Sequence, residues 1–175
     1  MPLSAHSVQR LSQILQVTVL ALAIGLAGCL MWVYFDPRNV VPDLPDRGWT
    51  GPYSLTFLWG FIALGTALSA VGFLALWRLY ALVRCFAEGT FLTQTTVRAV
   101  QKLGHALIYL ALAKIAFGPL SDLWFIWISK PETGQVSLSV SSEEVGFLLV
   151  SGVLALVGHA LREGVAAASE NKGFI

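Results

Sequence analysis

Two apolar stretches without a single charge constrain this chain more than any other feature of its sequence. Residues 11–35 and 53–77 each run for 25 positions without Asp, Glu, Lys or Arg. The hydrocarbon core of a bilayer is about 30 Å thick, and about 20 helical residues cross it. Because backbone N–H and C=O groups in lipid must bond within their own segment, each stretch is predicted to form a transmembrane helix.

Two further stretches bring the predicted spans to four. Residues 104–129 are interrupted only by Lys114 and Asp122, and residues 145–161 are shorter but uncharged. Only 12% of the 175 residues are charged, whereas a soluble domain carries about 25%. The predicted fold class is therefore all-α integral membrane, a compact four-transmembrane-helix bundle that forms one domain. Its parts are helices at about 11–35, 53–77, 104–129 and 145–161, outer loops 36–52 and 130–144, a cytoplasmic connector 78–103 and a cytoplasmic tail 162–175.

The distribution of Lys and Arg predicts which side of the membrane the termini occupy. With both termini in the cytoplasm, the outer loops hold three basic residues, Arg38, Arg47 and Lys130, together with six acidic ones. The inner segments then hold seven basic residues, namely Arg10, Arg78, Arg84, Arg98, Lys102, Arg162 and Lys172. Since cytoplasmic segments are enriched in Lys and Arg, we expect both termini in the cytoplasm.

Catalytic and ligand-binding motifs are missing from the sequence. It contains no CxxC, HExxH, Walker A or GxGxxG pattern and no Ser/His/Asp arrangement on a predictable scaffold. The net charge of +1 gives no signal for nucleic acid. Glu143 and Glu144 resemble a catalytic carboxylate pair, but Ser141 and Glu144 fit a capping box at the start of the fourth helix. We therefore predict no enzymatic activity, no catalytic, metal or cofactor-binding residue, and no direct contact with nucleic acid.

One motif suggests an alternative in which the first apolar stretch is a cleaved signal rather than a transmembrane helix. Residues 26–29, LAGC, resemble the lipobox of a bacterial lipoprotein signal, whose use would remove the first helix and attach lipid to Cys29. The following residues, LMWVYF, are still apolar, whereas a cleaved signal stops being hydrophobic at its cleavage site. We therefore expect the stretch to be retained, with Cys29 and Cys85 as small apolar residues rather than a disulfide.

Polar residues inside the predicted third span raise the question of an ion or proton pathway. Lys114 lies about 15 Å from the inner end of that span, where a lysine costs about 2.5–3.5 kcal/mol. Asp122 lies two turns further out, about 12 Å along the helix axis and about 80° around it. One hypothesis is a small transporter or ion-conducting oligomer that uses both residues. The alternative is that Lys114 extends to the interface or to a polar pocket, with Asp122 near the outer surface.

His105 and His159 form a second candidate pair. They lie at the inner ends of the predicted third and fourth helices. Two histidines on neighbouring helices can hold a haem iron through their ring nitrogens. No supporting motif accompanies them, so no cofactor is predicted.

The segment between the second and third apolar stretches carries four of the seven inner basic residues. Thr93 is placed to cap a helix that begins at Gln94. Basic residues at this level lie among the lipid headgroups, where each attracts anionic lipid by about 1 kcal/mol. The candidate contacts for membrane lipid or for a cytoplasmic regulatory protein are Arg78, Arg84, Arg98 and Lys102.

Small residues four positions apart predict where helices pack closely. They occur in the first span (Ala21, Gly25, Cys29), the second (Gly65, Ser69) and the fourth (Ser151, Ala155). Small side chains at this spacing let helix backbones approach each other. The pattern predicts close packing within the bundle and leaves association into a homo-oligomer open.

Two segments carry a family resemblance. They are FAEGTFLTQTTVRAVQKLGHALIYLAL at 86–112 and HALREGVAAASENKGFI at 159–175. With the turn at 89–91 and the pair Arg98 and Lys102, they resemble an uncharacterised bacterial membrane family, domain of unknown function 2975, across nearly the whole chain. The resemblance implies a four-helix protein of the bacterial inner membrane with no established activity, and a role in signalling or in tethering a regulator. Lys114 falls where this family is expected to have a neutral residue, so no role is transferred to it.

Overall fold

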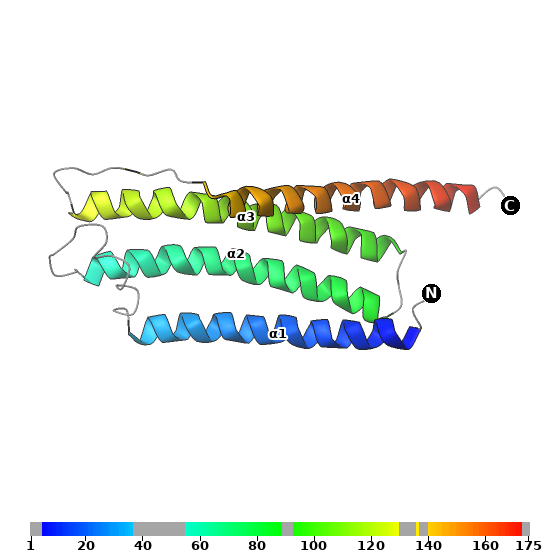
Figure 1. Ribbon diagram of the computed structural model, residues 1–175, viewed down its shortest axis with the longest axis horizontal. Helices are drawn as coiled ribbons and strands as arrows, with labels where there is room; N and C mark the ends of the chain where they lie inside the picture. Colours follow the sequence, from blue (N-terminus) through cyan, green and yellow to red (C-terminus); the bar gives the residue numbers. More distant parts are fainter. Residues whose placement is uncertain (1–4, 37–54, 89–92, 130–135, 137–139, 173–175) are drawn as a thin grey trace.

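The computed structural model of the chain describes residues 5–36, 55–88, 93–129, 136 and 140–172. These residues form four α-helices, which are α1 (Ala5–Phe35), α2 (Leu55–Ala87), α3 (Gln94–Ser129) and α4 (Ser142–Lys172). Consecutive helices run antiparallel, so α1 begins and α4 ends at the same end of the molecule (Figure 1). The predicted outer loops lie largely outside the described residues.

All four helices are long and apolar enough to cross a membrane. The suitable parts are Arg10–Phe35, Leu55–Ala87, Gln94–Ile128 and Ser142–Ala167. The predicted all-helical fold with four long apolar helices is thereby confirmed, and the chain has the build of a multi-pass membrane protein. The shortest helices have 31 residues, or roughly 46 Å at 1.5 Å per residue, against a hydrocarbon core of about 30 Å. Each helix is therefore longer than the hydrocarbon core of a bilayer.

The helices are longer than the apolar stretches that predicted them. The predicted connector 78–103 is mostly helical, because α2 continues to Ala87 and α3 begins at Gln94. The predicted tail 162–175 is helical as far as Lys172. Hydropathy identifies the part of a helix that is apolar enough for lipid. The helix itself can continue further, as long as its next turns pack against a neighbouring helix.

Packing between α2 and α3 explains why both helices continue. Leu82, Val100 and Leu103 form a buried cluster where α2 ends and α3 begins, and Leu79 and Phe86 pack against it. The α2 positions in this cluster recur at three- and four-residue spacing, which places them on one face of the helix. This apolar face sustains the helix after the uncharged stretch has ended.

Two helix starts follow the predicted capping chemistry. The Thr93 carbonyl accepts a hydrogen bond from the Val97 N–H at 3.1 Å, and its hydroxyl accepts one from the Thr96 N–H at 3.4 Å. At α4, the Ser141 hydroxyl accepts from the Glu144 N–H at 3.2 Å, and the Glu144 carboxylate accepts from the Ser141 N–H at 2.9 Å. This reciprocal pair is a capping box. Its carboxylate therefore stabilises the start of α4, as predicted.

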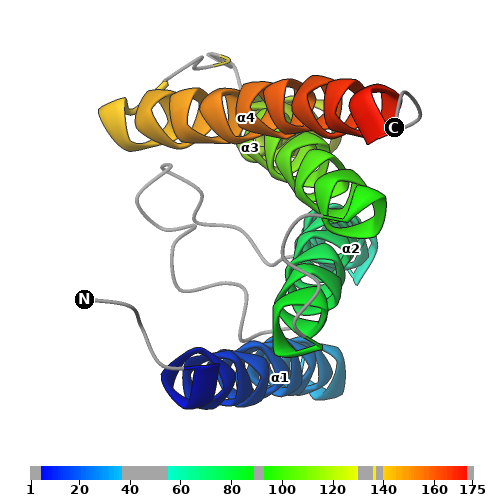
Figure 2. The ribbon, with the colours of Figure 1, turned by 90° about the vertical axis from the view of Figure 1, so that its right-hand side faces the viewer.

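The four helices form an open arc rather than the compact bundle predicted from the sequence. Among the described residues, α1 packs against α2 alone and α4 packs against α3 alone. Seen along the helix axes, the helices follow a C shape with α1 and α4 at its two ends (Figure 2). In lipid, apolar side chains gain little by exchanging lipid neighbours for protein neighbours. A bilayer around the helices would therefore not force the arc to close.

The backbones of α3 and α4 lie very close to each other. A Cβ atom at Gly104 would lie 2.8 Å from the backbone of Ala155, and Ser151, one turn earlier on α4, is fully buried. The predicted packing face of α4 is thus confirmed. The predicted small-residue faces of α1 and α2 are wrong for contacts within the chain. At Gly25 and at Gly65, a Cβ atom would have no neighbouring atom within 4 Å.

Aromatic residues join α2 and α3 at their other end. Phe57, Leu58 and Phe125 form a second buried cluster. The Trp124 indole N–H donates a hydrogen bond to the Phe57 carbonyl at 3.3 Å. Gly60 leaves the space that the Trp124 ring occupies, because a Cβ there would overlap the ring. The two middle helices are therefore fixed to each other at both ends.

Candidate functional site

α1 begins, α2 ends, α3 begins and α4 ends at one end of the molecule (Figure 1), and most of the described Lys and Arg residues belong to these helix ends. The Lys and Arg residues there whose side chains the structure describes are Arg10, Arg78, Arg84, Arg98, Lys102 and Arg162, and the corresponding acidic residues are Glu88 and Glu163. The described charged residues at the opposite end are Asp36, Glu143 and Glu144. We call the first of these regions the basic end. The antiparallel topology thus separates charge along the molecule.

The start of α3 positions two exposed basic residues. The Thr93 cap fixes the first turn of the helix, and Arg98 and Lys102 follow four positions apart on one exposed face. Val97 and Val100 are 3% and 8% exposed. The helix therefore packs through its valines and turns its two cations outward.

A third basic residue, from α4, shares a hollow with Arg98. The hollow is lined by Gln94, Val97, Arg98, Arg162 and Val165. Its two arginines come from different helices, so the hollow depends on how α3 and α4 pack. Its volume of ≈10 Å³ suits about one water-sized group. We call it the basic notch, and it admits one oxygen atom of a larger anion rather than a whole ligand.

The register of α4 on α3 creates the basic notch. One turn from the contact of Gly104 with Ala155, a Cβ at Gly158 would lie 2.9 Å from the Gln101 side chain and 3.0 Å from its backbone nitrogen. Arg98 lies one turn before Gln101 on α3, and Arg162 lies one turn after Gly158 on α4. Since glycine provides one partner at each crossing point, the backbones are close enough for both arginines to line one hollow.

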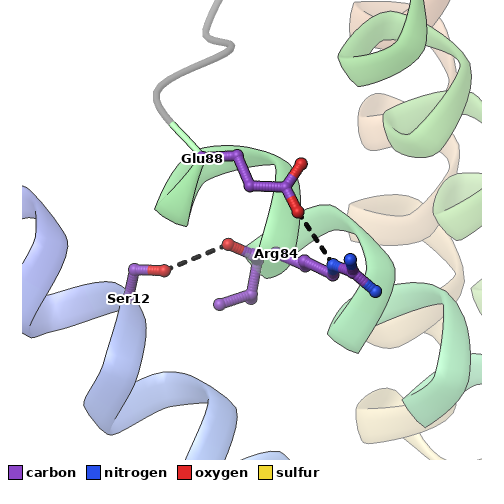
Figure 3. Close-up of polar contacts among 4 residues, drawn as sticks. Ser12, Arg84 and Glu88 are labelled. Atoms are coloured by element: carbon purple, nitrogen blue, oxygen red, sulfur yellow. Dashed lines mark hydrogen bonds and ion pairs between the residues drawn. The ribbon is translucent and has the colours of Figure 1, made fainter.

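The basic notch carries positive charge that no described acid compensates. Arg98, Lys102 and Arg162 form no ion pair with any residue that the structure describes. Arg84 differs, because its Nε lies 2.9 Å from the Glu88 carboxylate (Figure 3). These two side chains are 66% and 55% exposed, so the pair adds little stability, but it offsets the charge of Arg84.

The structure groups only part of the predicted set of basic contacts. Arg98 lines the basic notch and Lys102 follows on the same face, whereas Arg78 is half-buried on α2 and Arg84 is paired. The sequence counts Arg162 among the inner basic residues but does not connect it with Arg98. That connection depends on the register between two helices, which no local pattern specifies.

Gln101 links the two histidines that the sequence suggested as a pair. Its side-chain amide nitrogen lies 3.0 Å from Nδ1 of His159, and its backbone carbonyl lies 2.7 Å from Nδ1 of His105. Both rings therefore bond to one residue at the crossing of α3 and α4. In the described part of the chain, no group of three or more His, Cys, Asp or Glu side chains is arranged to hold a metal ion.

Lys114 and Asp122 lie on different faces of α3. Lys114 is exposed, whereas Asp122 is 8% exposed and has an interaction partner. Helix geometry separates them by about 12 Å along the axis, which is too far for a direct ion pair. A transport pathway through these residues stays a prediction.

Comparisons of the chain with protein-family models, with curated proteins and with solved structures give no match. Its function has to be inferred from the residues of the basic end themselves.

Proposed function

We propose that this chain is a non-enzymatic, multi-pass protein of the bacterial inner membrane whose basic notch binds the phosphate group of an anionic phospholipid. The observation that carries the proposal is that Arg98 and Arg162, from two helices, line one hollow and pair with no described acid. A guanidinium group offers a planar fork of N–H donors that matches phosphate oxygens. Two such groups around one space favour an anion with several oxygens.

The level of the basic notch along the helices supports a lipid ligand. Arg98 lies in the first turns of the candidate span Gln94–Ile128, and Arg162 lies in the last turns of Ser142–Ala167. The ends of a span lie at the depth of the headgroups, where each basic residue contributes roughly 1 kcal/mol toward an anionic surface. Lys102, exposed on the face of Arg98, adds to the same potential.

The separation of charge supports an orientation with both termini in the cytoplasm. The basic end holds the described Lys and Arg residues apart from Lys114, and the opposite end is acidic. Cytoplasmic segments of membrane proteins are enriched in Lys and Arg. The cytoplasmic leaflet also carries the anionic lipids, so in this orientation the basic notch meets the leaflet that contains its ligand.

The resemblance to domain of unknown function 2975 fits the same proposal, because it implies a bacterial four-helix membrane protein. The same resemblance also implies a different ligand for the basic end, namely a cytoplasmic regulatory protein. Lipid is favoured because both arginines of the basic notch lie within the end turns of candidate spans, at the depth of the headgroups. A soluble protein partner would instead need basic residues that extend into the cytoplasm beyond the lipid headgroups.

Lipid retention tests the proposal directly. The full-length protein is reconstituted in an equal mixture of phosphatidylglycerol and phosphatidylcholine, extracted into detergent, and examined by native mass spectrometry. We expect preferential retention of phosphatidylglycerol. The double variant Arg98→Gln/Arg162→Gln should retain about thirtyfold less of it, since two contacts of roughly 1 kcal/mol each are lost.

Arg10→Gln/Arg78→Gln is the matched control, because it removes two positive charges from α1 and α2, neither of which lines the basic notch. This variant should retain phosphatidylglycerol as the wild type does. Equal retention of both lipids by the wild type, or an equal loss in both variants, would show that the basic notch is not a lipid site. Loss of a bound cytoplasmic protein in the double variant, with lipid retention unchanged, would assign the surface to a regulatory partner instead.

A further inference from the structure

An apolar groove lies between α1 and α2, on the other side of the molecule from the basic notch. Its volume is ≈330 Å³, within the range of roughly 300–1,000 Å³ that is typical of ligand sites. The groove is lined by Val19, Leu20 and Ala23 of α1 and by Phe73, Trp77 and Tyr80 of α2. Apart from the indole nitrogen and the phenol oxygen, this lining offers only apolar contacts.

Polar contacts hold α1 and α2 together beyond both ends of the groove. At the basic end, the Ser12 hydroxyl donates to the Val83 carbonyl at 3.0 Å (Figure 3). Toward the other end, the Tyr34 and Thr66 hydroxyls share a hydrogen bond of 2.9 Å. Two separated attachments keep the helices in place on either side of the hollow section. The groove is therefore fixed by the fold.

The side chains on the face of α2 that lines the groove change from apolar to aromatic to charged toward the basic end. Phe73, Trp77, Tyr80 and Arg84 recur at three- and four-residue spacing, so Arg84 follows Tyr80 on the same face of α2. The Trp77 and Tyr80 ring centroids are 6.4 Å apart. Glu88 bonds the Arg84 Nε, and the two terminal nitrogens of Arg84 have no described partner. The face thus passes from apolar through aromatic to cationic.

We propose that this groove binds one acyl chain of a phospholipid, with the phosphate of that lipid at Arg84. α1 and α2 are both candidate spans, so in a bilayer the groove opens to acyl chains. The order of chain, interface and phosphate in a phospholipid matches the order of groups along α2. A second parallel copy of the chain would bring its own basic end to the level of Arg84, and like charges would oppose it. The site is separate from the basic notch and shares only the premise of membrane insertion.

Photolabelling tests the proposal. The full-length protein is reconstituted with a phospholipid that carries a diazirine on one acyl chain, irradiated, and mapped by peptide mass spectrometry. We expect the labels to concentrate in residues 19–23 and 73–80. Labels spread evenly over the exposed faces of α1 and α4 would show bulk lipid only. Cross-links between two copies through these residues would assign the groove to self-association, and either result would overturn the proposal.

Ala23→Phe and Ala21→Phe make a matched pair of variants. Ala23 lines the groove, whereas Ala21 is exposed on the same helix and does not. Ala23→Phe should lower labelling of the groove about fivefold, because the ring takes space that the chain needs. Ala21→Phe should leave labelling unchanged, as should Arg98→Gln/Arg162→Gln, which separates this site from the basic notch. Undiminished labelling in a folded Ala23→Phe protein would contradict the proposal.

Discussion

Single residues without side chains control the position of the charged groups at the basic end. Gly104 lies against Ala155, and Gly158 lies against Gln101. These contacts set both the distance and the register between α3 and α4. Arg98 lies one turn further along the same face of α3. The geometry of the basic notch therefore depends on the close helix packing that glycine allows because it has no Cβ atom.

Gly104→Ala should therefore weaken the pairing of α3 with α4. The added Cβ would lie 2.8 Å from backbone atoms of Ala155, which cannot move aside as a flexible side chain can. Overpacking of this kind costs roughly 1–3 kcal/mol, and we expect a lower midpoint of thermal unfolding in detergent. Gly152→Ala on the partner helix α4 is the control, because a Cβ there has no atom of a neighbouring helix within 4 Å. Equal midpoints for the two variants would show that α3 and α4 do not need this contact.

The sequence predicts individual residues well where their role is local. The capping residues Thr93, Ser141 and Glu144 act as predicted, because a cap involves neighbours within three or four positions. Gly25 fails as a packing residue, since spacing shows that a face is smooth but not which helix meets it. Arg162 was not predicted as a partner of Arg98 for the same reason.

At the scale of elements, the basic end is a packed structure rather than a set of flexible connections. The end of α2 and the start of α3 share the buried cluster of Leu82, Val100 and Leu103. The sequence predicted the amphipathic start of α3 but ended the second helix near residue 77, ten positions before Ala87. The cause is physical: the last turns of α2 are maintained by packing on one face, which average hydropathy does not detect.

Leu103→Ala should loosen this part of both helices. Leu103 is 4% exposed, and a cavity at such a site costs about 2–5 kcal/mol. We expect faster hydrogen–deuterium exchange at the end of α2 and the start of α3, measured by mass spectrometry. Leu112→Ala provides the comparison, because Leu112 on the same helix is 50% exposed and should leave exchange unchanged. Unaltered exchange in Leu103→Ala would mean that the cluster does not hold the two helices together.

At the scale of the whole molecule, an open arc with separated charge is the main result. The number, type and order of the helices follow from the apolar stretches, because backbone bonding in lipid permits no other spanning element for such segments. The arc does not follow from them, since contacts between helices depend on shape rather than hydropathy. Its consequence is that α1 and α4 stay largely exposed, with lipid sites proposed at the basic notch and in the groove between α1 and α2.

The central claim is that the four helices cross the membrane with the basic end in the cytoplasm. Cysteine labelling tests it in a chain that carries Cys29→Ser and Cys85→Ser. Thr95→Cys places a thiol at the basic end and Val140→Cys at the opposite end, both at exposed positions. A maleimide that cannot cross membranes should label Val140→Cys in intact spheroplasts and Thr95→Cys only after the membrane is disrupted. The reverse pattern, or labelling of both variants in intact spheroplasts, would contradict the account.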